Sequence, residues 1–287
     1  MKYNAILPTG ILAASLLFSG CGQQDKTEAD QAPAESAATE TSTVPASDLS
    51  AAIEQYRSFA VEQCDLFVKE TEKFTAAVKA GNLDEAKKLY APARAYYERI
   101  EPVAEALGDL DPNIDARVND VDAADWRGFH RIEKALWEDK TAAGQEGYAD
   151  QLLKDAQLLR AKIETIDIDA SLMVTGAVEL LNEVSSSKVT GEEELYSHTD
   201  LYDFAANVEG ANQIFEILKP ELAKKDADLE KEIGERFAAL KQELDAFKKG
   251  DGYADYTDLK EDEIRKLSQN LDALAEPLSN MGKILGV

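Results

Sequence analysis

The stretch IEQYRSFAVEQCDLFVKETEKFTAAV, residues 53–78, carries the clearest structural pattern of this chain. Its apolar positions recur every three or four residues, which is the spacing of one face of an α-helix. These positions, with one threonine among them, are Ile53, Tyr56, Ala60, Cys64, Phe67, Thr71, Phe74 and Val78. The run begins near Ser50 and ends at the AGN of residues 80–82. It therefore predicts a long amphipathic helix in which Cys64 is a buried small hydrophobe.

The helical spacing continues along most of the chain. A second run covers residues 83–107, and GDLDPNID at residues 108–115 interrupts it, with Pro112 suited to the first turn of a short helix. Further helices are predicted near residues 126–137, 146–164, 170–187, 200–221, 226–249 and 259–284. No segment alternates in the manner of a strand. We therefore predict an all-α protein, a two-lobed antiparallel helical bundle whose halves each resemble a four-helix bundle.

The charge of the chain is strongly negative. With 31 basic and 56 acidic residues, the formal charge is −25. Phosphates would be repelled, so nucleic acid is not an expected partner. A metal cation would be attracted, although an acidic surface can also serve solubility alone.

The N-terminal residues predict export and anchoring. Residues 1–21, MKYNAILPTGILAASLLFSGC, place Lys2 before an apolar run and small residues before Cys21, as in a secretory signal peptide. LFSGC resembles a bacterial lipobox, which predicts that Cys21 is lipidated; ordinary cleavage nearby is the alternative. Residues 22–48 are predicted to be a disordered tether, and residues 49–287 the helical domain.

Two pairs of residues have a spacing that suits metal binding. His130 and Glu133, within GFHRIEKALWED at residues 128–139, lie three positions apart and so share one face of a helix. Glu98 and Glu101 repeat this spacing. Pro102 follows them and lacks an N–H group, which leaves the carbonyl of Glu98 without its helical donor. An ordinary solvated helix face is the alternative for both pairs.

Two aspartates of the next turn, Asp111 and Asp115, could complete a metal site, because two ligands are too few to hold an ion. Asp111 precedes Pro112 and could instead cap the short helix. Glu179 and Glu183 are acids of the same ambiguous kind, and His198, the second histidine, is expected to have a structural role.

The motif Gly-x-His-x-x-Glu at residues 128–133 resembles that of the imelysin/EfeO family, and so do three other stretches. They are ARAYYERIEPVAEALGDLDPNIDAR, ELLNEVSSSKVTGEEELYSHTDLYDFAANVEGA and KPEL. The resemblance runs from about Ser50 to the C-terminus. It implies a two-lobed helical fold in envelope proteins linked to iron acquisition, with His130 and Glu133 at the metal site and Glu98 and Glu101 as its acidic pair. Between Cys21 and Ser50 there is no room for a cupredoxin domain, so the chain looks like the short EfeM-type lipoprotein.

The predicted function is binding of iron, as Fe³⁺ or Fe²⁺, at an oxygen-rich site with one imidazole, which would also accept Zn²⁺ or Cu²⁺. The protein would be anchored by lipid to a membrane on the periplasmic side of the bacterial envelope. The resemblance implies an iron permease and a haem peroxidase as partners. Because delivery requires release, we expect an exposed cleft between helices rather than a closed cage.

Two other functions compete with iron delivery, although no enzymatic activity is expected. A metallopeptidase would need His-Glu-x-x-His, but Arg131 follows His130 and Lys134 follows Glu133. A binding protein for an acidic polysaccharide such as alginate would need a basic patch to overcome the negative charge. Five arginines near the predicted site could form one, namely Arg94, Arg99, Arg117, Arg127 and Arg131.

Overall fold

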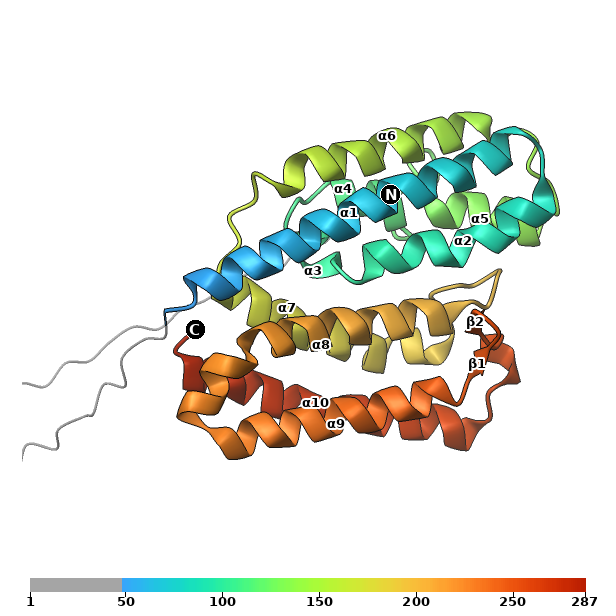
Figure 1. Ribbon diagram of the computed structural model, residues 1–287. Coiled ribbons are helices and arrows are strands. Elements are labelled where there is room, and N and C mark those ends of the chain that lie inside the picture. Colours follow the sequence, from blue (N-terminus) through green and yellow to red (C-terminus); the bar gives the residue numbers. More distant parts are fainter. Residues whose placement is uncertain (1–47) are drawn as a thin grey trace, which may run out of the picture. The chain divides into compact units, whose positions relative to one another are not determined.

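The computed structural model describes residues 48–287, in which ten α-helices form two packed lobes (Figure 1). The first lobe contains α1 (Ser50–Lys79), α2 (Leu83–Glu98), α3 (Glu101–Glu105), α4 (Leu110–Asp115), α5 (Phe129–Trp137) and α6 (Glu146–Ile163). The second contains α7 (Ala170–Ser186), α8 (Asp200–Lys225), α9 (Ala227–Asp245) and α10 (Glu261–Leu285). The predicted all-α, two-lobed fold is confirmed. The predicted signal peptide, its Cys21 and nearly all of the tether lie outside the described residues.

The first helix forms where its spacing predicts. Tyr56, Phe67 and Phe74 of α1 are fully buried, and the helix packs against α2 and α6. Cys64 is buried on the same face, as predicted. After Lys79 the chain turns, and the side chain of Asn82 accepts a hydrogen bond of 3.3 Å from the backbone N–H of Glu85. This bond satisfies one of the free donors in the first turn of α2.

The predicted helical run over residues 83–107 is broken into α2 and α3. The break follows Glu98, as expected from Pro102, which cannot donate to the Glu98 carbonyl. The side chain of Asn207 on α8 donates to this carbonyl instead, at 2.9 Å. Gly210, one turn further along α8, lies so close that a Cβ atom there would come within 2.4 Å of the Arg99 carbonyl oxygen. The break thus brings the second lobe against the end of α2.

The four long helices of the second lobe pack in neighbouring pairs, α7 against α8 and α10, and α9 against α8 and α10. Two short 3-10 helices, η1 (Lys188–Thr190) and η2 (Tyr256–Asp258), lie in its loops. A small antiparallel pair of strands, β1 (Lys248–Lys249) and β2 (Gly252–Tyr253), was not predicted. The lobes meet where α2 contacts α8 and α3 contacts α7. Within residues 48–287, no helix is both long and apolar enough to cross a membrane.

Gly128 closes the first lobe at the start of α5. Its φ is +90°, and a Cβ atom there would lie 2.3 Å from the backbone oxygen of Ile114 at the end of α4. Only glycine fits both the left-handed backbone and the close approach. Gly128 therefore brings Asp115, next to Ile114, beside His130, two residues after the glycine.

Gly128→Ala is expected to destabilise the protein by about 2–4 kcal/mol, because the backbone strain adds to a clash with an atom that cannot rotate away. Urea denaturation followed by circular dichroism measures this. Gly144→Ala is the matched control, since Gly144 also has a positive φ, of +83°, but nothing within 4 Å of the added Cβ atom. Equal effects of both changes would contradict the role given to the contact with Ile114.

Candidate metal centre

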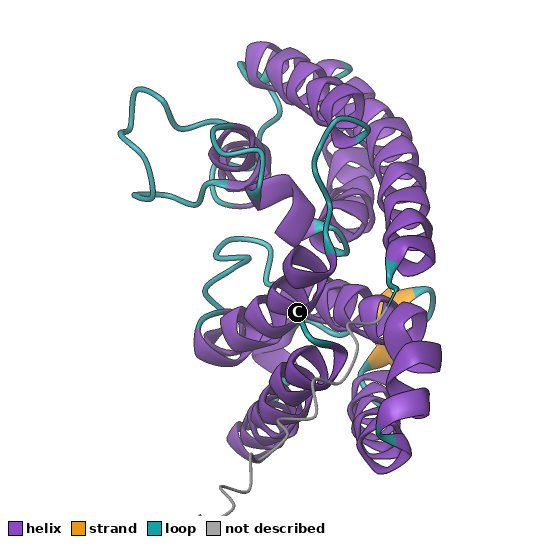
Figure 2. Ribbon diagram, turned by 90° about the vertical axis from the view of Figure 1, so that its left-hand side faces the viewer, coloured by secondary structure: helices purple, strands orange, loops and turns teal. Residues whose placement is uncertain are grey.

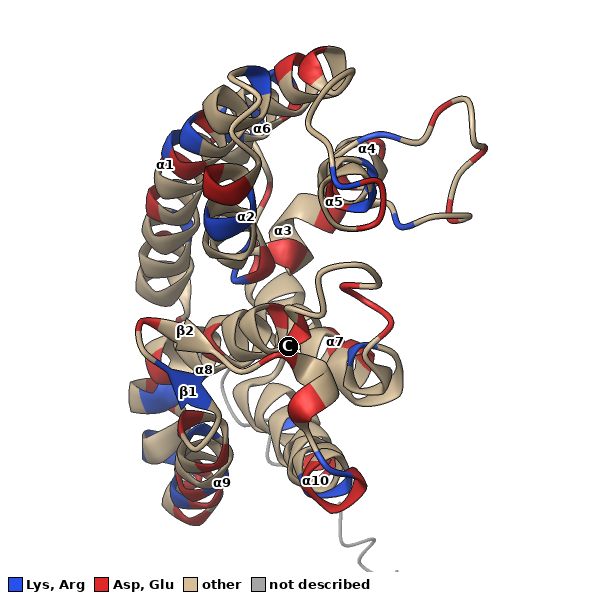
Figure 3. Cartoon of the chain, turned by 90° about the vertical axis from the view of Figure 1, so that its right-hand side faces the viewer, with Lys and Arg blue, Asp and Glu red and all other residues tan. Residues whose placement is uncertain are grey.

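Buried acidic side chains gather where the two lobes meet. Figure 3 shows acidic segments on α3 at this boundary. Asp115 at the end of α4 has a side chain only 10% exposed. Other members of the group are buried on α2, α3, α5, α8 and the segment after η1. They are Glu98, Glu101, Glu133, Glu193, Glu194, Asp200 and Asp203. Two buried cations with permanent charge lie among these acids, Arg94 and Lys188.

Arg94 on α2 is fully buried at the centre of the acidic group. Its guanidinium is 2.6 Å from carboxylate oxygens of both Glu98 and Glu194, 3.3 Å from Asp203, and also forms an ion pair with Asp115. The ring of Phe129 lies beside it. A planar cation with five donors can join acids from several elements, so Arg94 ties α2 to α4, α8 and the segment after η1.

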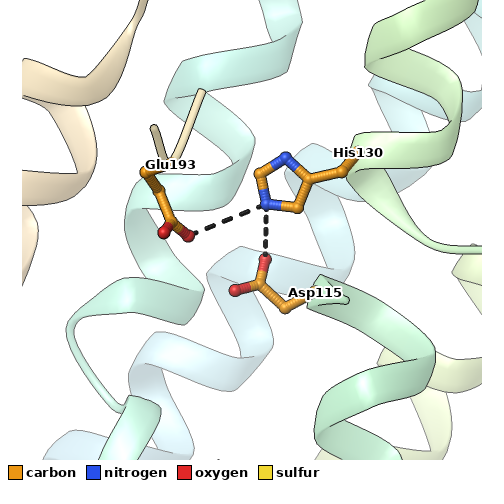
Figure 4. A group of neighbouring side chains, drawn as sticks. All are labelled: Asp115, His130 and Glu193. Atoms are coloured by element: carbon orange, nitrogen blue, oxygen red, sulfur yellow. Dashed lines mark ion pairs between the residues drawn. The ribbon is translucent and has the colours of Figure 1, made fainter. Parts of the chain in front are cut away.

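His130 on α5 is 1% exposed and faces carboxylates through both ring nitrogens. Nδ1 lies 3.1 Å from Glu133 Oε2 and 3.4 Å from the Tyr90 hydroxyl. Nε2 lies 3.6 Å from Asp115 Oδ1 and 3.7 Å from Glu193 Oε1 (Figure 4). Nε2 is buried and has no hydrogen-bond partner among residues 48–287. One imidazole nitrogen is therefore held by Glu133, and the other points between two carboxylates.

Glu133 is fixed from two sides. Its Oε1 accepts backbone N–H groups of Tyr196 and Ser197 at 2.9 and 2.7 Å, while Oε2 faces the His130 ring. Burial alone would raise the pKa of Glu133, but the hydrogen bonds from His130 and from these two N–H groups lower it. The Glu133 carboxylate is thus ionised, and it joins α5 to the segment that carries Glu193 and Glu194.

The pair Glu98 and Glu101 surrounds a lysine rather than the histidine. Lys188 Nζ, buried on η1, is 2.8 Å from Glu98 Oε2 and 3.1 Å from Glu101 Oε2. Asn207 donates to the same two oxygens, at 3.0 and 2.9 Å. As predicted, the pair lies on other helices than His130 and Glu133. It borders the His130 group, because Lys188 Nζ is also 4.0 Å from Glu193 Oε1.

Two sets of three side chains near His130 could hold an ion, each with ligand atoms within 4.8 Å of one another. One is Asp115, His130 and Glu193, and the other is His130, Glu133 and Glu194. A third set, further from the histidine, combines Glu101 with Glu105 and Glu183. Asp111, predicted as a ligand or a cap, forms neither a cap nor part of these sets; it accepts a hydrogen bond from the Tyr97 hydroxyl.

Two opposing effects set the pKa values in this group, namely burial, which disfavours the charged form, and neighbouring charges and hydrogen bonds. Burial and Arg94 oppose the charged form of His130, yet the hydrogen bond to Glu133 and the nearby carboxylates of Glu193 and Asp115 raise its pKa to about 9. Burial raises the pKa of Asp115 to about 6 despite the charge of Arg94. Burial would raise the pKa of Glu193 too, but Lys188 and His130 hold it well below its usual range. In the metal-free protein, an imidazolium thus lies between carboxylates.

The expectation of an exposed site was wrong in one respect, because the imidazole and its nearest carboxylates are buried rather than lining an open cleft. Two hollows adjoin the group. One, of about 370 Å³, is lined by His130, Glu133 and Glu193 among others. The other, of about 210 Å³, is lined by Asp115 and Glu193 and by the acids of the third set.

Six residues of the group were not among the predicted ligands, namely Glu193, Glu194, Asp200, Asp203, Lys188 and Arg94. Glu193 and Glu194 lie in an irregular segment, and their only signal was the run of three glutamates at residues 192–194. Lys188 gave no signal of its own. Arg94 was considered only as a surface charge, although it shares a helical face with Tyr90 and Tyr97, both buried.

The fold and the site define a class of protein: a two-lobed helical bundle with a buried imidazole–carboxylate group able to hold a metal ion. Residues 52–281 match the family described as imelysin, whose short name marks it as a peptidase family. An Efem/EfeO family lipoprotein of Staphylococcus haemolyticus (strain JCSC1435) is 47% identical over 283 residues, which cover 97% of this chain and 98% of the relative. One of Staphylococcus aureus (strain NCTC 8325 / PS 47) is 48% identical over 243 residues, or 83% and 86% of the two chains. The chain belongs to the imelysin family, among its Efem/EfeO lipoproteins.

Proposed function

We propose that this protein is an envelope lipoprotein that binds an iron ion through Asp115, His130 and Glu193 and delivers it to a membrane permease. The observation that carries this proposal is the buried Nε2 atom of His130, which has no hydrogen-bond partner among the residues that the structure describes and faces two carboxylates. A buried polar atom without a partner is costly. A metal ion is a partner that suits both the nitrogen and the oxygens.

The distances fit one ion. Nitrogen and oxygen ligands bind transition metals at about 2.0–2.2 Å, so two ligands of one ion lie at most about 4.4 Å apart. His130 Nε2 is 3.6 Å from Asp115 Oδ1 and 3.7 Å from Glu193 Oε1. Glu133 then orients the imidazole, because it accepts a hydrogen bond from Nδ1 of His130 and leaves Nε2 to the ion. This arrangement is common among metal-binding histidines.

The ionised carboxylates of the group favour a cation. The eight buried or nearly buried acids of the group face only Arg94 and Lys188 as permanent internal cations. Glu98 and Glu101 are largely balanced by Lys188, whereas Asp115 and Glu193 also face the histidine. Two carboxylates and one imidazole are hard or borderline ligands, which suits Fe³⁺ or Fe²⁺ and also admits Zn²⁺ or Cu²⁺.

Neither competing function gains support from the contacts. A zinc peptidase of the usual kind needs a second histidine and a general base free to activate water. His130 is the one histidine of this group in the described part of the chain, and Glu133 is engaged by two backbone N–H groups. Binding of an acidic polysaccharide would need the predicted basic patch at the surface, but Arg94, one of its five arginines, is fully buried and cannot contact a polymer.

The wild-type protein is expected to take up one equivalent of Zn²⁺ or Fe²⁺, and Glu193→Gln to bind it at least ~10-fold more weakly, because one ligand loses its charge. Competition with a chromophoric chelator measures both affinities. Asp155→Asn is the matched control, since Asp155 is buried on α6 but belongs to no metal-binding set. Peptide hydrolysis by metal-loaded wild type that is lost in Glu193→Gln would favour the peptidase instead. Failure of the wild type to bind any metal would refute the proposal.

For the anchor, Cys21→Ser is expected to abolish incorporation of labelled fatty acid and to move the protein from the membrane fraction to the soluble fraction. The lipobox-like LFSGC supports this, as do the relatives named as lipoproteins. Cys64→Ser is the control, because Cys64 is buried in α1 and inaccessible to acylation. Retention of label in Cys21→Ser would show that the chain is anchored differently.

A further inference from the structure

The loop between α4 and α5 borders the proposed metal site, because Arg117 and Asp120 near its start line the hollows beside Glu193. Residues 116–128 contain no helix, and the connection reaches away from the labelled helices α4 and α5 in Figure 3; it is the long teal loop at the upper left of Figure 2. The two ends of the loop are fastened together, because Trp126 Nε1 donates to the carbonyl of Ala116 at 2.8 Å. The guanidinium of Arg131 packs on the Trp126 ring and on that of Tyr148. The base of the loop is thus held in place beside the site.

Arg117, the second residue of this loop, contacts a proposed metal ligand directly. Its Nη1 is 2.8 Å from Glu193 Oε2, and its Nε and backbone N–H both donate to Asp120 Oδ2, at 3.1 and 3.0 Å. Glu193 therefore has one oxygen on Arg117 while the other faces His130 Nε2. The position of Arg117 depends on a local contact within the loop and on the metal ligand itself.

Arg117 differs from the other two cations with permanent charge beside the acidic group. Arg94 and Lys188 are fully buried, whereas the Arg117 side chain is 35% exposed. It also lines both hollows that adjoin the group, together with Asp120 and Glu193. A half-exposed side chain can leave its partner for solvent at low cost, while the two buried cations cannot.

We propose that Arg117 is the gate of the metal site: it neutralises Glu193 in the metal-free protein, swings towards solvent when a cation binds, and promotes release when it returns. This inference rests on the proposed function and identifies Arg117 as the residue that promotes release of the metal ion. A cation on Glu193 Oε1 and a guanidinium on Oε2 repel each other across one carboxylate. Arg117 therefore weakens metal binding and shortens the lifetime of the complex, which suits a protein that hands its cargo on.

The test compares Zn²⁺ binding to the full chain and to three variants, with dissociation followed by stopped flow into excess chelator. Arg117→Gln is expected to bind Zn²⁺ at least ~10-fold more tightly, with most of the gain in a slower dissociation rate. Arg117→Lys, which keeps the charge, should stay within about threefold of the wild type. Arg160→Gln controls for the change of net charge, because Arg160 is similarly exposed, at 25%, but pairs with Asp65 and Glu164 away from the site. It should bind as the wild type does.

Unchanged or weaker binding by Arg117→Gln, in a protein whose binding still falls in Glu193→Gln, would overturn the gate and leave the proposed function standing. An equal gain in Arg160→Gln would also overturn the gate, since net charge would then explain the effect. A wild type that takes up no Zn²⁺ would overturn both.

Discussion

Arg94→Met is expected to lower the free energy of unfolding by about 3–5 kcal/mol, the cost of removing one partner from a buried ion pair. Arg94 is fully buried and holds Asp115 and Glu194 together with Glu98. Methionine fills much of the same volume but leaves these carboxylates without their cation. Urea denaturation at pH 7, followed by circular dichroism, measures the change.

Arg160→Met is the control for this substitution, because its exposed ion pairs contribute at most about 1 kcal/mol. If Arg94→Met does not fold, Arg94→Lys keeps the charge, loses the planar fork and is expected to fold with a smaller loss of stability. Equal stability of Arg94→Met and the wild type would show that the acids are not held together by this cation.

The Arg94→Met deficit should shrink as the pH falls. Burial tends to raise the pKa of Glu98, but Lys188 and Arg94 lower it in the folded wild type. A carboxyl group with a depressed folded pKa stabilises the protein above its unfolded pKa, near 4.5, and loses this contribution as the pH falls through the folded value. Without Arg94 the pKa of Glu98 rises, so the variant lacks this contribution to the free energy of unfolding at pH 7. Its stability therefore falls less than that of the wild type when the pH is lowered.

The helices of this protein were predictable because their signal is local. The apolar spacing of residues 53–78 is that of α1, and the break after Glu98 follows from the N–H group that Pro102 lacks. The short strands near residue 250 were not foreseen, since only four residues pair. The acidic group was predictable only in part, because Glu193 reaches His130 through the packing of two lobes, which no spacing along the chain encodes.

The contacts of Lys188 were also not predictable from spacing along the chain. The spacing of Glu98 and Glu101 indicates that their carboxylates face a common partner, and both contact Lys188. Pro102 indicates that the helix is interrupted between the two glutamates. The sequence predicts a metal ion as the cation nearest to the two glutamates. In the structure this cation is Lys188, whose Nζ lies 2.8 Å from Glu98 Oε2 and 3.1 Å from Glu101 Oε2. A lysine 90 residues away along the chain leaves no mark near the glutamates, so sequence alone cannot tell an internal ammonium from a metal ion.

His130→Ala is expected to weaken Zn²⁺ or Fe²⁺ binding by at least ~100-fold at pH 9, where about half of the wild-type imidazole is neutral and only the carboxylates remain to the variant. The pKa of about 9 makes binding an exchange, since the ion must displace the His130 proton. Wild-type affinity should therefore fall ~10-fold for each pH unit below 9, equivalent to ~1.4 kcal/mol per unit. An unperturbed histidine, with a pKa near 6.5, would not begin this decline until about pH 7.

The shapes of the two pH curves separate the histidine from the acids. His130→Ala should lose the part of the decline that comes from the imidazole and keep the part in which Asp115 takes up its proton. That part begins above pH 6, because the variant lacks the charge of His130 that lowers the pKa of Asp115. The advantage of the wild type over the variant thus narrows as the pH falls, because the histidine contributes only after it gives up its proton. Chelator competition at half-unit steps from pH 5.5 to 9.5 resolves both curves, with Asp155→Asn as a control expected to follow the wild type. Two curves of the same height and slope would mean that His130 Nε2 does not meet the ion, and the carboxylates of the group would then have to bind it without the imidazole.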